Sequence, residues 1–263
     1  MSVQHYENFP IASFLCPKRL RPAVASLYWF ARTADDLADE GGIPSEQRLA
    51  DLTAYRADLT SVLQGETPSA RWQGLFQALC KYALAKVPFP NHHLYALLDA
   101  FEKDVRDTAA SYCYQTRSEL LAYCQLSANP VGRLMLHFFD VDDDLSKTQS
   151  DAICSALQLI NFWQDVSVDV PRGRFYVLPA EAESLQALCG WARGLMMAGS
   201  PLCKRLSGNA SWRFGFELRL VVQGGLRILD KIEAQGFDTT LSRPKINKWD
   251  APLILWRALL MFR

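Results

Sequence analysis

The sequence predicts an all-α protein, and three observations support this prediction. Apolar residues recur at helical spacing along most of the chain. No stretch alternates apolar and polar residues for long enough to form a sheet. Proline residues, the Gly41-Gly42 pair and capping residues punctuate the apolar pattern. Because no linker and no internal repeat divides the chain, residues 1–263 are expected to form one helical domain.

The boundary signals place the expected helices. Pro22 and Pro44 suit first turns, Thr116–Glu119 matches a capping box, and Pro171 stops a helix. Asp142–Asp144 form a loop that is expected to cap the helix after it. In chain order the expected helices are Pro22–Glu40, Pro44–Leu63, Pro68–Lys86, Asn91–Thr108, one starting at Thr116, one from Asn129 to Phe139, Gln149–Val170, Pro179–Leu206, Trp212–Gln235 and Lys245–Phe262.

Composition and charge exclude several classes of protein. With 263 residues, 49% of them hydrophobic, the chain can bury a full core and is not disordered. Lys plus Arg and Asp plus Glu both number 28, so no basic excess indicates a nucleic-acid partner. The seven cysteines form no Cys-x-x-Cys pair, which favours reduced thiols in the cytoplasm. The sequence has no signal-peptide pattern and no apolar run of about 20 residues, so we expect neither secretion nor a membrane span.

One polar stripe follows the first long helix. Tyr28, Arg32, Asp35 and Asp39 are separated by four, three and four residues, so they share one helical face, and Asp36 lies beside them. The rest of this helix is apolar nearly all round, which predicts a central position and a stripe that lines a cavity. An exposed charged edge with an Arg–Asp pair is the alternative.

A second polar stripe has similar spacing far along the chain. Gln158, Asn161, Asp165 and Asp169 are separated by three, four and four residues among apolar neighbours. Four carboxylates across one cavity would repel each other, and a cation would offset that cost. Mg²⁺ favours carboxylates together with substrate phosphates, whereas a di-iron bundle needs Glu-x-x-His motifs, which this sequence lacks. The stripes therefore predict a site for Mg²⁺ and a diphosphate.

Basic side chains near the stripes are candidates to bind that diphosphate. Arg can contact phosphate oxygens through two N–H groups, although a solvated surface position is as common for each arginine taken alone. Apolar walls around a diphosphate indicate a prenyl diphosphate, because helices of about 20 residues are ~30 Å long and could enclose an isoprenoid tail. The candidates are Lys18, Arg19, Arg21, Arg32, Arg172 and Arg174.

These motifs resemble the squalene/phytoene synthase family along nearly the whole chain. The resemblance implies the isoprenoid synthase fold, a single helical bundle with a central active-site cavity. It also implies two or three Mg²⁺ ions, bound with the diphosphate by Asp35, Asp39, Asn161, Asp165 and Asp169. The matching residues are Tyr28-x-x-x-Arg32-x-x-Asp35-Asp36-x-x-Asp39, Tyr123-Cys124, Val131-Gly132, Gln158-Leu-Ile-Asn161-x-x-x-Asp165-x-x-x-Asp169 and Arg172-Gly-Arg-Phe-Tyr-Val-Leu-Pro179.

The same resemblance implies roles for further residues. Tyr28 and Arg32 are expected beside the reacting diphosphate, and Tyr176 is expected to stabilise a cation by its ring face, with a core aromatic as the alternative. An N-terminal segment of the family covers the site. The expected substrate-binding residues are His5, Asn8, Phe9, Asp36, Gln158, Arg172 and Arg174.

Within the family, three segments look like the bacterial hydroxysqualene synthase branch, which is associated with squalene and hopanoid synthesis. They are His5–Pro10, Ser127–Gly132 and Asn161–Asp165, and Gln164 stands where head-to-head synthases usually have Arg. That branch ionises presqualene diphosphate and captures the rearranged cation with water, a lyase reaction. It needs no NADPH, and the sequence has no Gly-rich dinucleotide motif. Asn129 is expected to hold the attacking water or to cap the helix at Pro130.

Two other functions stay open at this point. One is a head-to-head prenyl transferase that makes presqualene diphosphate or phytoene, and the other is a non-catalytic member that acts in binding or assembly. As a hydroxysqualene synthase, the protein would have a presqualene diphosphate synthase and a hydroxysqualene dehydroxylase-type flavoprotein as pathway partners. The segment Lys245–Arg263 is a candidate for peripheral contact with the inner membrane face, with a last core helix as the alternative.

Overall fold

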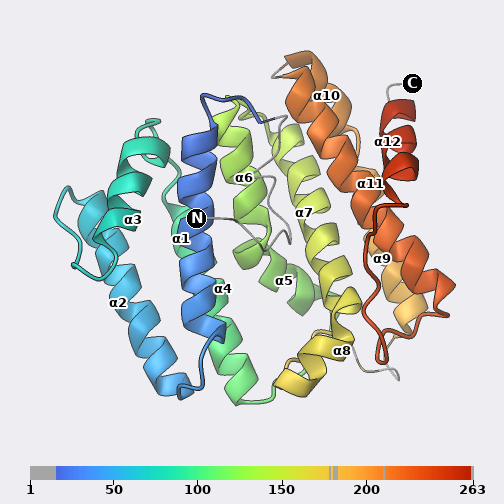
Figure 1. The fold of residues 1–263 in the computed structure, drawn as a ribbon, viewed down its shortest axis with the longest axis horizontal. Coiled ribbons are helices and arrows are strands. Elements are labelled where there is room, and N and C mark those ends of the chain that lie inside the picture. The colour runs from blue at the N-terminus through green and yellow to red at the C-terminus, as the bar shows by residue number, and fades with distance from the viewer. Residues whose placement is uncertain (1–15, 178, 180–182, 210, 262–263) are drawn as a thin grey trace. The chain divides into compact units, whose positions relative to one another are not determined.

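The computed structural model describes residues 16–177, 179, 183–209 and 211–261, most of them in helices (Figure 1). Within these residues, pairing of the β type is confined to an isolated bridge between Cys113 and Phe175. The predicted all-α fold is therefore confirmed. The chain divides into two compact units, an N-terminal unit, Met1–Pro90, and a C-terminal unit, Asn91–Arg263.

An aromatic cluster forms the core of the N-terminal unit. Phe30, Tyr55 and Phe76 are completely buried, the rings of Phe30 and Tyr55 stack with centroids 5.3 Å apart, and the Tyr55 hydroxyl donates to the Phe30 carbonyl at 3.1 Å. Burial of these rings fixes the apolar face of the first helix against its neighbours. The described helices of this unit are α1 (Arg21–Asp39), α2 (Ser45–Leu63), α3 (Gln73–Ala78) and the π-helix η1 (Leu79–Ala83).

The expected helix from Pro68 to Lys86 is wrong at its start. Residues 66–72 form loop and turn, and α3 begins only at Gln73. The Asp58 carboxylate of α2 accepts the Ser69 backbone N–H at 2.9 Å and the Ser69 hydroxyl at 2.6 Å. These bonds offer the backbone an alternative to the helix, which is the usual effect of Ser in such a position.

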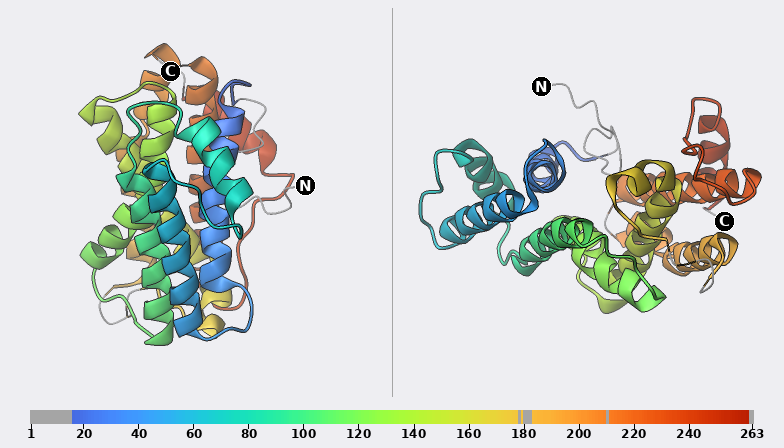
Figure 2. Two further views of the ribbon diagram at one scale, coloured as in Figure 1. Left: turned by 90° about the vertical axis from the view of Figure 1, so that its left-hand side faces the viewer. Right: turned by 90° about the horizontal axis from the view of Figure 1, so that it is seen from below.

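The C-terminal unit is built around α7 (Asp144–Gln164), which packs against α5, α6, α9 and α11 (Figures 1 and 2). Ala156, Leu159 and Trp163 of this helix are completely buried. None of the helices among the described residues combines the length and the apolarity that crossing a membrane requires. The other elements of this unit are α4 (His92–Ala109), α5 (Arg117–Ser127), α6 (Asn129–Phe138), α8 (Val166–Asp169), the 3₁₀-helix η2 (Val170–Arg172), α9 (Leu185–Gly199), α10 (Leu202–Asn209), α11 (Trp212–Ala234) and α12 (Ala251–Leu260).

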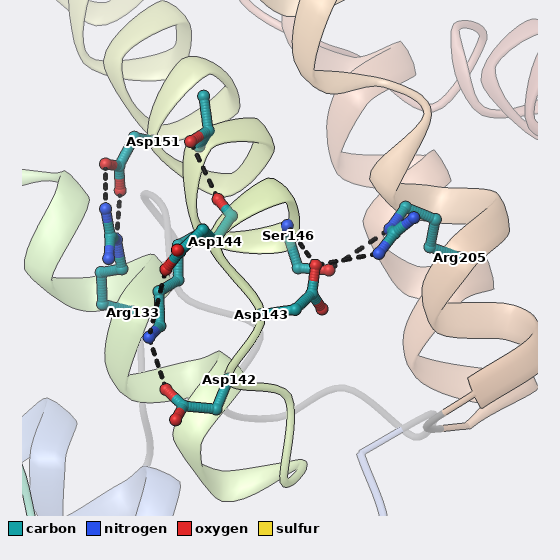
Figure 3. A network of polar contacts seen from close by, with 9 residues as sticks. Arg133, Asp142, Asp143, Asp144, Ser146, Asp151 and Arg205 are labelled. Carbon is teal, nitrogen blue, oxygen red and sulfur yellow. Dashed lines mark hydrogen bonds and ion pairs between the residues drawn. The ribbon is translucent and has the colours of Figure 1, made fainter.

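Carboxylates fix the first half of α7 (Figure 3). Asp143 is its N-cap residue and accepts the Ser146 backbone N–H at 2.9 Å and a guanidinium N–H of Arg205 from α10, also at 2.9 Å. On α7 itself, Asp151 binds Arg133 of α6 through two contacts of 2.8 and 2.7 Å. The cap expected in this acidic loop is therefore confirmed.

Three expected helices of the C-terminal unit are shorter or divided. The helix expected over Gln149–Val170 begins earlier, at Asp144, and is interrupted at Asp165, after which α8 and η2 follow. The helix expected over Pro179–Leu206 is divided at Pro201, whose nitrogen cannot donate. The last helix begins at Ala251 instead of Lys245, with Pro252 in its first turn.

Candidate active site

Arg32 lies at the centre of the first acidic motif, on α1. Its guanidinium contacts the carboxylates of Asp35 at 3.0 Å, Asp36 at 2.6 Å and Glu40 at 2.7 Å. Burial raises the pKa of Asp36, and the positive charge of Arg32 acts in the opposite direction. One guanidinium therefore contacts three carboxylates and offsets one of their charges, so the Arg–Asp pair expected in the alternative interpretation is present.

The remaining predicted residues of α1 flank this motif. Tyr28 is half-buried one turn before Arg32, and its ring meets Trp29 edge to face at 5.2 Å between centroids. Asp39, the last residue of α1, is also half-buried. Because α1 is continuous from Arg21 to Asp39, Asp35 and Asp39 share one face, as their spacing predicts.

The second acidic motif extends across a helix junction. Gln158 and Asn161 lie in α7, Asp165 occupies the junction, and Asp169 ends α8. The Asp165 N–H donates to the Asn161 carbonyl at 2.9 Å, and the Asp169 N–H donates to the Asp165 carbonyl at 2.8 Å. These two bonds preserve the helix-like spacing of the motif although the helix itself is interrupted.

Arg243, which the sequence did not single out, binds Asp165. Its Nη2 lies 3.0 Å from Asp165 Oδ2, and its Nε donates to Oδ1. The neighbouring Gln164 is buried and donates to the Pro244 carbonyl at 2.6 Å. Two consecutive side chains at the junction thus hold residues 243–244, a pairing that no local sequence signal reveals.

A tight turn brings the predicted basic loop back to the second motif. Gly173 has a φ of +77°, which side chains other than glycine rarely adopt, and its N–H donates to the Val170 carbonyl at 3.0 Å. The Arg174 N–H then donates to the Asp169 carbonyl at 3.0 Å. Arg172 is exposed and Arg174 is half-buried. The two predicted phosphate-binding arginines therefore follow directly on the end of the acidic motif.

Tyr176 lies in an aromatic cluster that includes a carboxylate. Its ring stacks on Phe162 of α7, 3.8 Å between centroids and 6° from parallel, so Phe162 covers one of its faces. Its hydroxyl donates to Asp104 of α4 at 3.0 Å, and the Tyr123 hydroxyl donates to the same carboxylate at 2.6 Å. Burial raises the pKa of Asp104 to about 7, although both hydroxyls and the charge of Arg174 act to lower it.

Asp104 is a candidate functional residue that the sequence analysis missed. A signal was present, because Asp104 follows Leu97 and Phe101 at helical spacing, on the apolar side of its helix. A carboxylate at such a position needs hydrogen-bond donors from elsewhere in the fold. Which residues supply these hydrogen-bond donors depends on tertiary contacts.

Asn129 does not cap α6, so that alternative is wrong. Ala128 is the N-cap residue, and Asn129 is the first residue of the helix. The Asn129 Oδ1 accepts the hydroxyl of Ser155, on α7, at 2.9 Å, and only 9% of Asn129 is exposed. Its Nδ2 carries two further N–H groups that this bond does not use.

The described part of the chain begins at Cys16, so only some of the predicted residues near the start of the chain can be placed. His5, Asn8 and Phe9 lie outside the described residues. Lys18 and Arg19 are exposed, and Arg21 donates from Nε to the Cys16 carbonyl at 3.0 Å.

The donors at the two motifs are carboxylate and amide oxygens, which suit Mg²⁺. Over its described residues, neither unit gathers three His, Cys, Asp or Glu side chains in a group that could hold a metal ion. Instead, Arg32 pairs with carboxylates of the first motif and Arg243 pairs with Asp165. The residues present therefore fit Mg²⁺ by chemistry, and bound Mg²⁺ would compete with these guanidinium groups.

The fold is that of the isoprenoid synthases. The crystal structure of squalene synthase HpnC from Alicyclobacillus acidocaldarius superimposes with a TM-score of 0.76 and 33% identity, covering 89% of this chain and 90% of that one. Residues 2–183 match the family described as Squalene/phytoene synthase. The chain therefore belongs to the squalene/phytoene synthase family, as its motifs predicted.

Several relatives are named hydroxysqualene synthase, and two of them show the extent of the match. One, from Zymomonas mobilis, is 37% identical over 70% of this chain, a match that spans 59% of its own length. The other, from Rhodopseudomonas palustris, is 31% identical over 87% of this chain and 80% of its own. A presqualene diphosphate synthase from R. palustris also matches, at 32% identity over 66% of this chain and 58% of its own.

Proposed function

We propose that the protein is a Mg²⁺-dependent hydroxysqualene synthase, which converts presqualene diphosphate and water to hydroxysqualene and diphosphate. The observation that carries the proposal is the similarity to a hydroxysqualene synthase over 87% of the chain. The buried amide of Asn129 and the uncharged Gln164 support the same branch.

The reaction divides into ionisation and capture. In the first step the C–O bond to the diphosphate breaks and its electron pair leaves with the diphosphate; in the second, water oxygen bonds to the rearranged cation and loses a proton to solvent. When bound, Mg²⁺ would neutralise the negative charge of the leaving diphosphate. Asp35, Asp39, Asn161, Asp165 and Asp169 would hold the metal ions.

The other predicted site residues would bind the substrate. Arg172 and Arg174 would contact phosphate oxygens, with Arg32 and Tyr28 beside the reacting diphosphate. Asp36 and Gln158 complete the proposed binding residues. We expect two or three Mg²⁺ ions to bind with the diphosphate, and we expect no requirement for NADPH.

We expect Asn129→Leu to change the product more than the rate of substrate consumption. The variant keeps the branched shape of the side chain, with a larger volume, and removes the N–H groups proposed to hold the attacking water. Loss of one such bond should lower the ratio of alcohol to hydrocarbon products by about tenfold. Gas chromatography of the products measures this ratio, and Ser155→Ala, which leaves the amide in place, is the control. An unchanged ratio in Asn129→Leu contradicts the role in water capture.

Assays with single substrates separate the proposed function from its alternatives. Purified protein with Mg²⁺ and without NADPH is given presqualene diphosphate, farnesyl diphosphate or geranylgeranyl diphosphate. A C30 alcohol from presqualene diphosphate alone is the expected result. Consumption of either other substrate would favour a head-to-head transferase, and no turnover of any would favour a non-catalytic member.

The apolar product suggests delivery at a membrane surface, and α12 is our candidate for the contact. Ala258 is the buried residue of this helix, whereas Trp256 is 61% exposed, so α12 is not a core helix. Trp249, which precedes the helix, is 79% exposed. Lys245 and Lys248 are exposed, while Asp250, the one carboxylate between residues 243 and 261, is buried. Exposed tryptophans and lysines without exposed carboxylates suit an anionic lipid surface.

Flotation with anionic vesicles tests this contact. The intact protein should float at low salt and less at physiological salt. Trp249→Ser combined with Trp256→Ser should reduce the bound fraction about tenfold, because buried apolar area is lost. Trp212→Ser removes another exposed tryptophan, 59% exposed and outside this segment, and should bind as the wild type does. Failure of the intact protein to float, or an equal loss in the control, contradicts the proposal.

A further inference from the structure

Asp104 joins two other parts of the C-terminal unit to α4 through its two carboxylate oxygens. Oδ2 accepts the hydroxyl of Tyr123, from α5, at 2.6 Å, and Oδ1 accepts the hydroxyl of Tyr176, from the loop after η2, at 3.0 Å. Tyr123 is 4% and Tyr176 is 9% exposed, so both tyrosines are buried and the carboxylate is the acceptor that the structure gives each hydroxyl. One carboxylate therefore fixes both tyrosines.

The loop that carries Arg174 is held on both sides of this arginine. On the N-terminal side, the backbone N–H of Arg174 itself donates to the Asp169 carbonyl. After it, the Tyr114 N–H donates to the Phe175 carbonyl at 3.3 Å, and Tyr176 is fixed by its ring stacking and by Asp104. The bond between Tyr176 and Asp104 is thus one of the contacts that hold the backbone on the C-terminal side of Arg174.

Electrostatics couple Asp104 to the same arginine. Burial raises the pKa of Asp104 and the pKa of Tyr176, and the charge of Arg174 acts to lower both, so its guanidinium lies within electrostatic range of the two groups. An apolar residue at position 104 would avoid the cost of burying a carboxylate. It would also leave two buried hydroxyls without an acceptor, which is costly in turn.

We propose that Asp104 is a positioning residue, which orients Arg174 for diphosphate by holding Tyr176 and Tyr123 in place. The inference rests on the proposed function in one respect, namely that Arg174 binds a diphosphate. It does not depend on which prenyl chain the diphosphate carries. Asp104 itself does not contact the substrate in this scheme.

Calorimetric titration of the full-length protein with inorganic diphosphate at saturating Mg²⁺ tests the proposal. Asp104→Ala removes both carboxylate oxygens, so that neither the Tyr123 nor the Tyr176 hydroxyl keeps its acceptor. It should weaken diphosphate binding about tenfold, as changes behind a ligand-binding group often do. Arg174→Gln should weaken binding at least as much. In the double variant, the fold-loss of affinity should be clearly smaller than the product of the fold-losses of the two single variants.

Two further variants keep the test independent of folding. Tyr176→Phe removes one of the two hydrogen bonds without leaving a cavity and should lower the affinity in the same direction. Asp107→Asn changes a carboxylate one turn along α4 that accepts the Tyr114 hydroxyl at 3.1 Å, and it should leave the affinity within about twofold of wild type. Circular dichroism and thermal unfolding establish that each variant is folded.

Wild-type affinity in folded Asp104→Ala, or losses that multiply in the double variant, would overturn the positioning role, as would a wild-type protein that binds no diphosphate. If the losses couple as expected but presqualene diphosphate is not converted to an alcohol, the positioning role stands and the proposed reaction is rejected. The two hypotheses are therefore judged by different measurements.

Discussion

Replacement of Asp165 by asparagine is expected to lower turnover by about a hundred- to a thousandfold at saturating Mg²⁺. The variant removes a charged oxygen ligand at the junction of α7 and α8 and keeps the size of the side chain. Because Asp165 is paired with Arg243, the change removes an ion pair instead of relieving repulsion between carboxylates. The free energy of unfolding should therefore fall slightly, by about 1–2 kcal/mol.

Asp151→Asn provides a matched control for this prediction. Asp151 lies on the same helix and also binds an arginine through two contacts, to Arg133, but it belongs to neither acidic motif. Steady-state kinetics should show near-normal turnover in this control and a similar change in stability. Near-normal activity of Asp165→Asn would refute its assignment as a metal ligand.

Gly199→Ala is expected to lower the free energy of unfolding by about 2–3 kcal/mol. Gly199 ends α9 where this helix crosses α7. An added Cβ would lie 2.5 Å from the Gln149 carbonyl oxygen and 2.6 Å from the Ile153 side chain. The backbone oxygen cannot rotate away, so the helices would have to separate.

Chemical denaturation measures this loss, and a second glycine of the same helix serves as the control. A Cβ added at Gly194 would meet no atom within 4 Å, so Gly194→Ala should stabilise the helix by about 0.5–1 kcal/mol. Equal stability of the two variants would contradict the close approach of α9 to α7.

The parts of the fold that depend on local signals could be predicted from the sequence. The helices at Pro22, Pro44 and Asn91 were placed within a residue or two, because proline and glycine act on the backbone next to them. The acidic motifs were identifiable for a similar reason, since residues four apart share a helical face.

Contacts between distant residues could not be predicted in this way. Asp58 holds Ser69 out of a helix that the local pattern favoured, and Arg243 reaches Asp165 from 78 residues away. Asp104 was missed because its significance comes from two tyrosine hydroxyls on other elements. In each case a polar side chain meets its partner only after the helices have packed.

The most direct test of the proposed function is conversion of presqualene diphosphate in water enriched in ¹⁸O, with Mg²⁺ and without NADPH. Mass spectrometry of the C30 product should show one ¹⁸O atom in an alcohol, because the oxygen comes from the water that captures the cation. An unlabelled alcohol, a hydrocarbon as the main product, or no reaction would contradict the account.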